Sequence, residues 1–288
     1  MDKGIDVSYA QGNINWKRVQ TDFAIIRAGY GRESTQKDAQ FDNNYEGCKS
    51  NKVPCGAYWY SYALSADEAK KEAAACISVI KGKKYEYPIY YDIENSNQFA
   101  LGKAKCTEIA RAFLEELESQ GYWAGLYSSK YSLEQYFTED LRKRYAVWVA
   151  NYGVDETDYS GPFGIWQYSS DGKMNGISGN VDMNYCYIDY PSFIKRAGKN
   201  GFVAEKPALD KTGYKKGDST IGSLALKEML LIAQKLDINK YGMDENSSFG
   251  DGTLRAVNGL LKKWGYQENG IAGRNFIMKL KSEIFKKI

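Results

Sequence analysis

Short apolar and aromatic runs recur eight times over residues 4–184, and polar or helix-like connections separate them. The runs span residues 4–7, 23–29, 54–62, 85–94, 122–128, 145–150, 163–168 and 177–184. Strand-like runs that alternate with such connections are typical of a parallel sheet closing into a β/α barrel. Residues 65–80 and 106–120 have helical spacing of apolar side chains, but the connection 151–162 is too short and Gly-rich for a full helix. We therefore predict an α/β fold, an incomplete (β/α)8-type barrel with fewer helices than strands.

The fourth run ends in two carboxylates, Asp92 and Glu94, that are two residues apart. Side chains alternate along a strand, so both acids face the same side, with Cα atoms about 6.6 Å apart. Two acids this close at the end of a buried strand repel each other, and one should keep its proton to unusually high pH. Acid catalysis at a glycosidic bond requires such a proton donor. The alternative is a strand end whose acids are only solvated or cap a helix.

In a β/α barrel the functional groups lie at the carboxyl ends of the strands. The polar and aromatic residues near the predicted strand ends are Asp6, Arg27, Tyr58, Tyr60, Asp92, Glu94, Tyr127, Trp148, Gln167 and Asp182. Four acids and several aromatic rings at one mouth indicate an active site more strongly than one pair of acids does. Single members also have structural alternatives, since Trp148 and Tyr58 could be core residues and Arg27 could only neutralise a buried acid.

The chain has no His. Its absence excludes Ser-His-Asp hydrolysis, Cys-His peptidases and His-ligated zinc hydrolases, so carboxylate chemistry remains. The five cysteines form no C-x-x-C pair and predict neither a zinc site nor a redox motif. We expect buried free thiols, with a disulfide between Cys48 and Cys55 as the alternative. The expected chemistry needs no metal and no other cofactor.

The formal net charge of +3 is too small to indicate a nucleic acid partner, although it suits a polyanionic surface such as a bacterial wall. The 24 Tyr and 6 Trp residues supply flat amphipathic rings, which bind sugars but also fill cores. No run approaches the roughly 18 apolar residues of a membrane span, so no membrane insertion is expected. Residues 1–6 contain no signal-peptide h-region.

Five motifs occur in order along the chain. They are Gly4-Ile5-Asp6-Val7-Ser8, Tyr91-Asp92-Ile93-Glu94, Val147-Trp148-Val149-Ala150-Asn151-Tyr152, Ile165-Trp166-Gln167-Tyr168 and Gly179-Asn180-Val181-Asp182. Together they resemble glycoside hydrolase family 25, the lysozymes (N-acetylmuramidases) of bacteria, fungi and phages. The resemblance covers residues 1–197. It implies an incomplete β/α barrel that hydrolyses bacterial peptidoglycan, with retention, at the β-1,4 bond between N-acetylmuramic acid and N-acetylglucosamine.

Matched onto this chain, the resemblance implies that Glu94 is the general acid/base. Asp92 would stabilise the cationic centre or orient the 2-acetamido group of the substrate as nucleophile, and Asp6 and Asp182 would be the other acids of the cleft. The expected substrate contacts are Tyr58, Tyr60, Tyr127, Trp148, Gln167 and Arg27. From the residues alone the mechanism stays open, because the i, i+2 spacing fits the carboxyl separations of both retaining and inverting enzymes.

The composition changes past residue 196. Residues 198–217 are polar, rich in Lys and Gly, and predict a linker. Residues 218–288 predict a small three-helix bundle, with apolar residues at helical spacing in 219–236, 253–264 and 273–288. The motifs Phe249-Gly250-Asp251-Gly252-Thr253 and Ala256-Val257 resemble the peptidoglycan-binding domain type 1, which implies attachment to the cell wall. A generic helical appendage or a dimerisation module is the alternative.

The sequence thus predicts a modular cell-wall lysin, with its catalytic barrel in residues 1–197 and its wall-binding domain in residues 218–288. We expect synthesis in the cytoplasm and action on the wall, after release by a phage holin or after secretion with a leader that this sequence does not contain. Two other functions remain open: a barrel hexosaminidase of chitin-type specificity, and a non-catalytic cell-wall-binding protein. The oligomeric state is not predicted.

Overall fold

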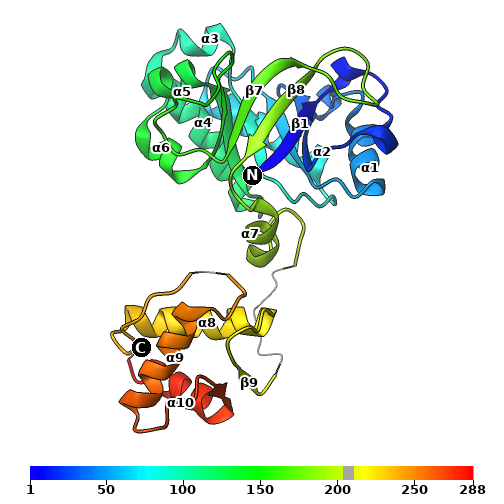
Figure 1. Ribbon diagram of the computed structural model, residues 1–288. Coiled ribbons are helices and arrows are strands. Elements are labelled where there is room, and N and C mark those ends of the chain that lie inside the picture. The colour runs from blue at the N-terminus through cyan, green and yellow to red at the C-terminus, as the bar shows by residue number, and fades with distance from the viewer. Residues whose placement is uncertain (204–210, 245, 288) are drawn as a thin grey trace. The chain divides into compact units, whose positions relative to one another are not determined.

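The computed structural model describes residues 1–203, 211–244 and 246–287, and the chain forms two compact units, Met1–Glu205 and Lys206–Ile288 (Figure 1). The predicted linker 198–217 crosses this border, and its residues 204–210 lie outside the described residues. Its last part differs from the prediction, since Gly213–Tyr214 form strand β9 of the second unit. The reason is that the ring of Tyr214 is fully buried in the core of that unit.

Eight strands close into a barrel in the order of the sequence. They are β1 (Asp2–Val7), β2 (Phe23–Tyr30), β3 (Cys55–Tyr60), β4 (Ile89–Asp92), β5 (Ala124–Ser129), β6 (Ala146–Ala150), β7 (Ile165–Gly172) and β8 (Val181–Cys186). Each overlaps one of the eight predicted runs, which confirms the barrel. Strand β4 is shorter than predicted, so Glu94 lies just beyond its carboxyl end.

The last strand departs from the predicted parallel arrangement. Strands β1 to β7 run parallel to their sequence neighbours, whereas β8 is antiparallel to both β7 and β1. A parallel neighbour needs a crossover of a dozen or more residues, but only residues 173–180 join β7 to β8. The amino end of β8, which carries Asp182, therefore lies at the mouth where the parallel strands end.

The helices around the barrel are fewer than a complete β/α repeat would have. They are α1 (Phe41–Ser50), α2 (Ala66–Ile80), α3 (Ser96–Phe99), α4 (Gly102–Ser119), α5 (Lys130–Tyr136), α6 (Glu139–Arg144) and α7 (Tyr190–Ala197). Between β1 and β2 the chain forms only the 3-10 turns η1 (Tyr9–Gln11) and η2 (Trp16–Arg18), and a third, η3 (Ser34–Gln36), follows β2. Within residues 1–203, all described, the β6–β7 and β7–β8 connections contain no helix, as expected for an incomplete barrel.

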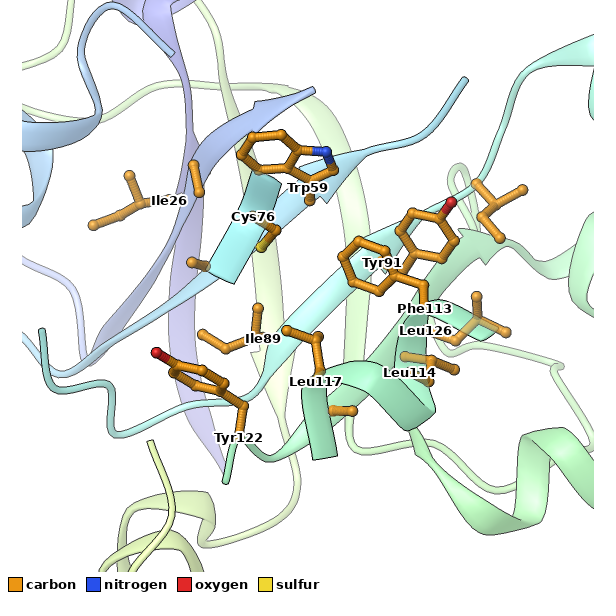
Figure 2. Packing of buried hydrophobic residues seen from close by; sticks show 14 of the residues in the cluster. Ile26, Trp59, Cys76, Ile89, Tyr91, Phe113, Leu114, Leu117, Tyr122 and Leu126 are labelled. Atoms are coloured by element: carbon orange, nitrogen blue, oxygen red, sulfur yellow. The ribbon is translucent and has the colours of Figure 1, made fainter. Parts of the chain in front are cut away.

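Alternate strand residues face two separate cores. The outer core lies between the barrel and helices such as α2 and α4, and Figure 2 shows Tyr91, Phe113 and Leu117 within it. The rings of Tyr91 and Phe113 stack with their centroids 3.7 Å apart. Inside the barrel the ring of Tyr90 packs against Gly125, where an added Cβ would lie 2.5 Å from that ring. Tyr90 and the other residues of the inner core close the barrel below its mouth, as side-chain layers do in barrels of this kind.

Two further expectations concern cysteines and membrane spans. All five cysteines are buried and free, so the alternative disulfide between Cys48 and Cys55 does not form. Among the described residues, no helix combines the length and the apolar character that a membrane span requires.

The described residues of the second unit form three helices and a short strand pair. The helices are α8 (Ile221–Lys235), α9 (Asp251–Lys263) and α10 (Arg274–Phe285), and β9 pairs antiparallel with β10 (Ala272–Gly273). Each helix overlaps one of the predicted helical segments. Leu230, Val257 and Leu280 place one residue from each helix in a shared core.

Among the described residues of this unit, the charged side chain of Lys227 is fully buried. The ammonium group of Lys227 donates hydrogen bonds to Asp244 Oδ1 at 2.9 Å, to Asn246 Oδ1 at 2.9 Å and to the carbonyl oxygen of Ser248 at 3.0 Å. A buried ammonium is tolerated only with such partners. Lys227 therefore fixes the connection between α8 and α9 to the helix that carries it.

Candidate active site

The strand register brings the predicted site residues to one end of the barrel. Arg27 pairs with Tyr58, Tyr60 with Asp92, Asp92 with Tyr127, Tyr127 with Trp148, and Asp6 with Asp182. Gln167 lies on β7, the neighbour of both β6 and β8, and Glu94 follows β4. All ten predicted residues thus belong to one ring around the mouth.

Asp6 and Asp182 form the acidic centre of the β1–β8 side. Gln167 Nε2 donates to Asp6 Oδ2 at 2.8 Å and lies 3.4 Å from Asp182 Oδ2. Asn184 Nδ2 also donates to Asp6 Oδ2, at 2.8 Å. Burial raises the pKa of Asp6 well above its usual value, and the charge of Asp182 raises it further, while the two amide donors lower it. Burial also raises the pKa of Asp182.

The amide of Gln167 is held from both ends. Its Oε1 accepts a hydrogen bond from the Tyr127 hydroxyl at 2.8 Å and another from the Tyr152 hydroxyl, which leaves Nε2 to donate to the acids. The Trp148 ring is also fixed by a hydrogen bond, because its Nε1 donates to Asn184 Oδ1 at 2.8 Å. These contacts make a continuous network below the acids.

Three of the predicted substrate contacts belong to this network. Trp148 and Gln167 are each only 1% exposed, and protein groups already satisfy their hydrogen-bonding atoms. Tyr127 is also buried, with its hydroxyl bound to Gln167. Protein groups therefore hold these three side chains in fixed positions at the mouth.

Asp92 is buried directly beside the half-buried Tyr60. Among the described residues its Oδ1 atom has no hydrogen-bond partner. Burial raises the pKa of Asp92 well above its usual value, and the nearby charges of Glu94 and Asp6 raise it further, while Arg27 lowers it. The structure therefore keeps an unsatisfied carboxyl group at the mouth, an arrangement that is frequent in functional sites.

Glu94 is the solvent-exposed member of the acid group. The surrounding protein still removes part of its hydration, and this burial raises the pKa of Glu94, with the charge of Asp182 as the second cause. An exposed acid with a raised pKa can reach a substrate and can hold a proton at higher pH than an ordinary glutamate. Asp92 and Glu94 thus differ as a buried and an accessible carboxyl group.

Two tyrosines complete the wall beside these acids. Tyr58 and Tyr60 are half-buried on β3. Burial, followed by the charge of Glu94, raises the pKa of Tyr60 to about 12. Burial and then the charge of Asp6 raise the pKa of Tyr58 well above its usual value. Both phenols therefore remain protonated near neutral pH and can donate hydrogen bonds.

Arg27 lies at the edge of the site and lines an open cavity of about 450 Å³ together with Tyr60. Three residues of the site did not emerge from the sequence: Asn184, Tyr152 and Tyr9, which also lines this cavity. Asn184 had a usable signal, a polar residue two positions after Asp182 on a predicted strand. No group of three or more acidic or cysteine side chains in the described part of the chain is arranged to hold a metal ion.

The sequence is similar to that of known proteins. A family model described as glycosyl hydrolases family 25 matches residues 5–177, which include Asp6, Asp92 and Glu94. The autolytic lysozyme of Clostridium acetobutylicum is 25% identical over 285 residues, covering 95% of this chain and 79% of that protein.

Solved structures show the same fold. The modular autolysin LytC from Streptococcus pneumoniae, determined with a synthetic peptidoglycan ligand, is 30% identical with a TM-score of 0.58, over 65% of this chain and 46% of that one. The lysozyme from Streptomyces coelicolor is 26% identical with a TM-score of 0.59, over 68% of this chain and 96% of that one. Since the family model spans more than half of the sequence, the chain belongs to the glycosyl hydrolases of family 25.

Proposed function

We propose that this glycosyl hydrolase cleaves bacterial peptidoglycan at the β-1,4 bond between N-acetylmuramic acid and N-acetylglucosamine, with retention. One observation supports this most directly: an accessible carboxyl, Glu94, and a buried one, Asp92, adjoin at the barrel mouth, and both have raised pKa values. The relatives add support, since one is an autolytic lysozyme and another was solved with a synthetic peptidoglycan ligand.

Glu94 is the proposed general acid/base. In its protonated form it gives a proton to the glycosidic oxygen as the bond from that oxygen to the anomeric carbon breaks. In its ionised form it then takes a proton from the water that attacks the same carbon. Its raised pKa keeps the acid form populated at higher pH than that of an ordinary glutamate.

Asp92 is proposed to act on the sugar that becomes cationic. Its carboxylate is proposed to accept a hydrogen bond from the 2-acetamido N–H, which orients the acetamido oxygen for attack on the anomeric carbon. Its negative charge also favours the cation that develops there. Asp6 and Asp182 are proposed to bind and polarise the substrate from the opposite side, with Gln167 as a positioning residue for both.

The second unit is proposed to anchor the protein to the cell wall. The match with the autolytic lysozyme covers 95% of this chain and so extends into this unit. A wall-binding unit tethered to the barrel would raise the effective concentration of the enzyme at an insoluble substrate.

The identity of the new reducing end tests the reaction. Purified walls are digested, reduced with borohydride and analysed by mass spectrometry. Muramitol as the new terminus is the expected result. Glucosaminitol would refute the proposed bond, and turnover of chitin oligomers at a rate equal to that of walls would favour a chitin-type hexosaminidase. Wall binding without any new reducing end would favour a non-catalytic binding protein.

A further inference from the structure

A cavity of about 450 Å³ lies beside the acids at the barrel mouth. Its walls include the rings of Tyr9, Tyr60 and Tyr62 and the cations Arg27 and Lys37. Tyr9 and Tyr62 are 59% and 51% exposed, so their rings are available to a ligand. Aromatic faces around a hydrogen-bonding cation suit a sugar that carries a negative charge.

Arg27 is fixed in this cavity before any ligand binds. Its Nε donates to Asp38 Oδ2 at 2.6 Å, and its guanidinium carbon lies 4.6 Å from the centroid of the Tyr9 ring. Asp38 is itself buried and satisfied, because its Oδ2 accepts from Tyr9 N at 3.0 Å and its Oδ1 accepts from Gln40 N at 2.8 Å. The guanidinium therefore holds one orientation without the entropic penalty of ordering it on binding.

The outer end of Arg27 remains unused. Within the described residues, the hydrogen bond from Arg27 to Asp38 uses Nε, and the two Nη groups have no hydrogen-bond partner. Lys37, the other cation, is engaged with Asp42 instead, at 2.5 Å. The planar fork of Nη donors matches the two oxygens of a carboxylate, which it binds in a bidentate manner.

The cavity adjoins the reacting centre. Tyr60 lies in its wall and pairs in register with Asp92, while Arg27 pairs with Tyr58 on the neighbouring strand. A glycan strand with one sugar at Asp92 and Glu94 would therefore reach this cavity with an adjacent part of the same strand.

We propose that this cavity binds a carboxylate carried by the glycan strand and that Arg27 determines the preference for such a strand. The inference rests on the proposed function. Peptidoglycan presents a carboxylate on the lactyl group of N-acetylmuramic acid or, when that group is amidated, on the stem peptide attached to it. Chitin presents neither, so Arg27 separates wall from chitin.

Binding by full-length Glu94→Gln protein tests the proposal, because ligands then remain intact. Isothermal titration compares a tetrasaccharide with free lactyl carboxylates, its methyl ester, and chitotetraose. A second pair carries the dipeptide L-Ala–D-Glu, with both glutamate carboxyl groups either free or amidated. We expect the free acid of one pair or both to bind about tenfold more tightly than its neutral partner. The pair that discriminates identifies the source of the carboxylate.

Substitution of Arg27 supplies the second arm. Arg27→Gln should abolish the difference between acid and neutral ligand while affinity for chitotetraose stays unchanged. Arg32→Gln is the matched control, since Arg32 carries the same charge nearby but donates to Glu68 at 2.7 Å outside the cavity. If Arg27→Gln fails to fold, Arg27→Lys replaces it, because lysine keeps the positive charge beside Asp38. Lysine lacks the planar pair of Nη donors, so Arg27→Lys should reduce the difference in affinity between the acid and the neutral ligand.

If the protein with Arg27 intact bound the acid and the neutral ligand of each pair equally well, the inference would be overturned. An equal loss for all ligands, chitotetraose included, in the Arg27 variant would also overturn it. The proposed function fails separately: it fails if the wild-type protein releases no muramic acid reducing ends, whatever the titrations show.

Discussion

Asp6 and Asp182 lie opposite each other on the antiparallel strands β1 and β8, bridged by one nitrogen of Gln167. Burial raises the pKa of Asp6 well above its usual value, and the charge of Asp182 raises it further. The mouth of the barrel therefore concentrates charge at the expense of stability, as functional sites often do.

Gln167→Met should weaken both stability and turnover. The variant removes the amide that Asp6, Tyr127 and Tyr152 share, and it leaves buried polar groups without partners. We expect a loss of about 1–3 kcal/mol in the free energy of unfolding, measured by urea denaturation. We also expect kcat to fall more than KM changes, because Gln167 is buried and acts through the acids. A change in KM alone would indicate direct sugar binding instead.

Asp92→Asn should not destabilise the barrel near neutral pH. Burial and the charge of Glu94 raise the pKa of Asp92, so the folded protein binds its proton more tightly than the unfolded chain. This proton stabilises the folded state. The stabilisation is complete at pH values below the usual carboxyl pKa, and it is lost as the pH rises through the raised pKa of Asp92. At pH 7 the urea midpoint of Asp92→Asn should therefore equal or exceed that of the parent, while activity is lost.

The control for this comparison is Asp42→Asn. Hydrogen bonding to Lys37 lowers the pKa of Asp42. The ionised Asp42 therefore contributes to the free energy of unfolding above the usual carboxyl pKa, and this contribution is lost on acidification. Its substitution should lower the midpoint at pH 7, if only slightly for an exposed group. A clear loss of stability for Asp92→Asn at pH 7 would show that Asp92 is structural.

Asp182→Asn should move the basic limb of the pH profile. That limb of kcat/KM reports the general acid of the free enzyme. The charge of Asp182 is the second cause of the raised pKa of Glu94, so its removal should shift the limb to lower pH on a soluble muropeptide substrate. Asp171→Asn removes the same charge from an exposed position on β7 and should leave the limb in place. An unmoved limb in Asp182→Asn would exclude Glu94 as the titrating acid.

Most of the site could be predicted from the alternation of side chains along the strands. Asp6, Tyr58 and Asp92 each lie on the inward face of a strand, and a period of two is readable without a structure. Depth along the strand is not, so the sequence does not show that Trp148 and Gln167 are almost fully buried. Depth depends on how the strands are staggered around the barrel, and that depends on pairing between distant segments.

Other features depended on contacts that no local pattern records. Asp182 was placed at the mouth as the end of a parallel strand, whereas it lies at the start of an antiparallel one. The contact between Tyr9 and Asp38 joins two loops that are 29 positions apart. Lys227, within an apolar stretch of α8, gave no sign that its ammonium group would be buried by the residues that precede α9.

Lys227→Met should selectively destabilise the second unit. Methionine fills the same volume but cannot donate to Asp244, Asn246 and Ser248. We expect a loss of about 1–2 kcal/mol for the unfolding of this unit, measured by urea denaturation, because Lys227 no longer donates to its partners while the exposed Asp244 stays solvated. Asp244→Asn should have a smaller effect, because the side chain of Asp244 is 63% exposed. Turnover of a soluble muropeptide should stay unchanged in both variants, and a parallel loss of turnover would contradict this separation of the two units.

The most direct test of the account is the rate at which Glu94→Gln forms new muramic acid reducing ends from purified walls. Glu94 is exposed, so the variant should fold as the parent does. Loss of general acid/base catalysis should lower this rate by about 10²–10⁴-fold, with wall binding retained. Formation of muramitol-terminated products at the wild-type rate would contradict the account, because the proton would then come from another group.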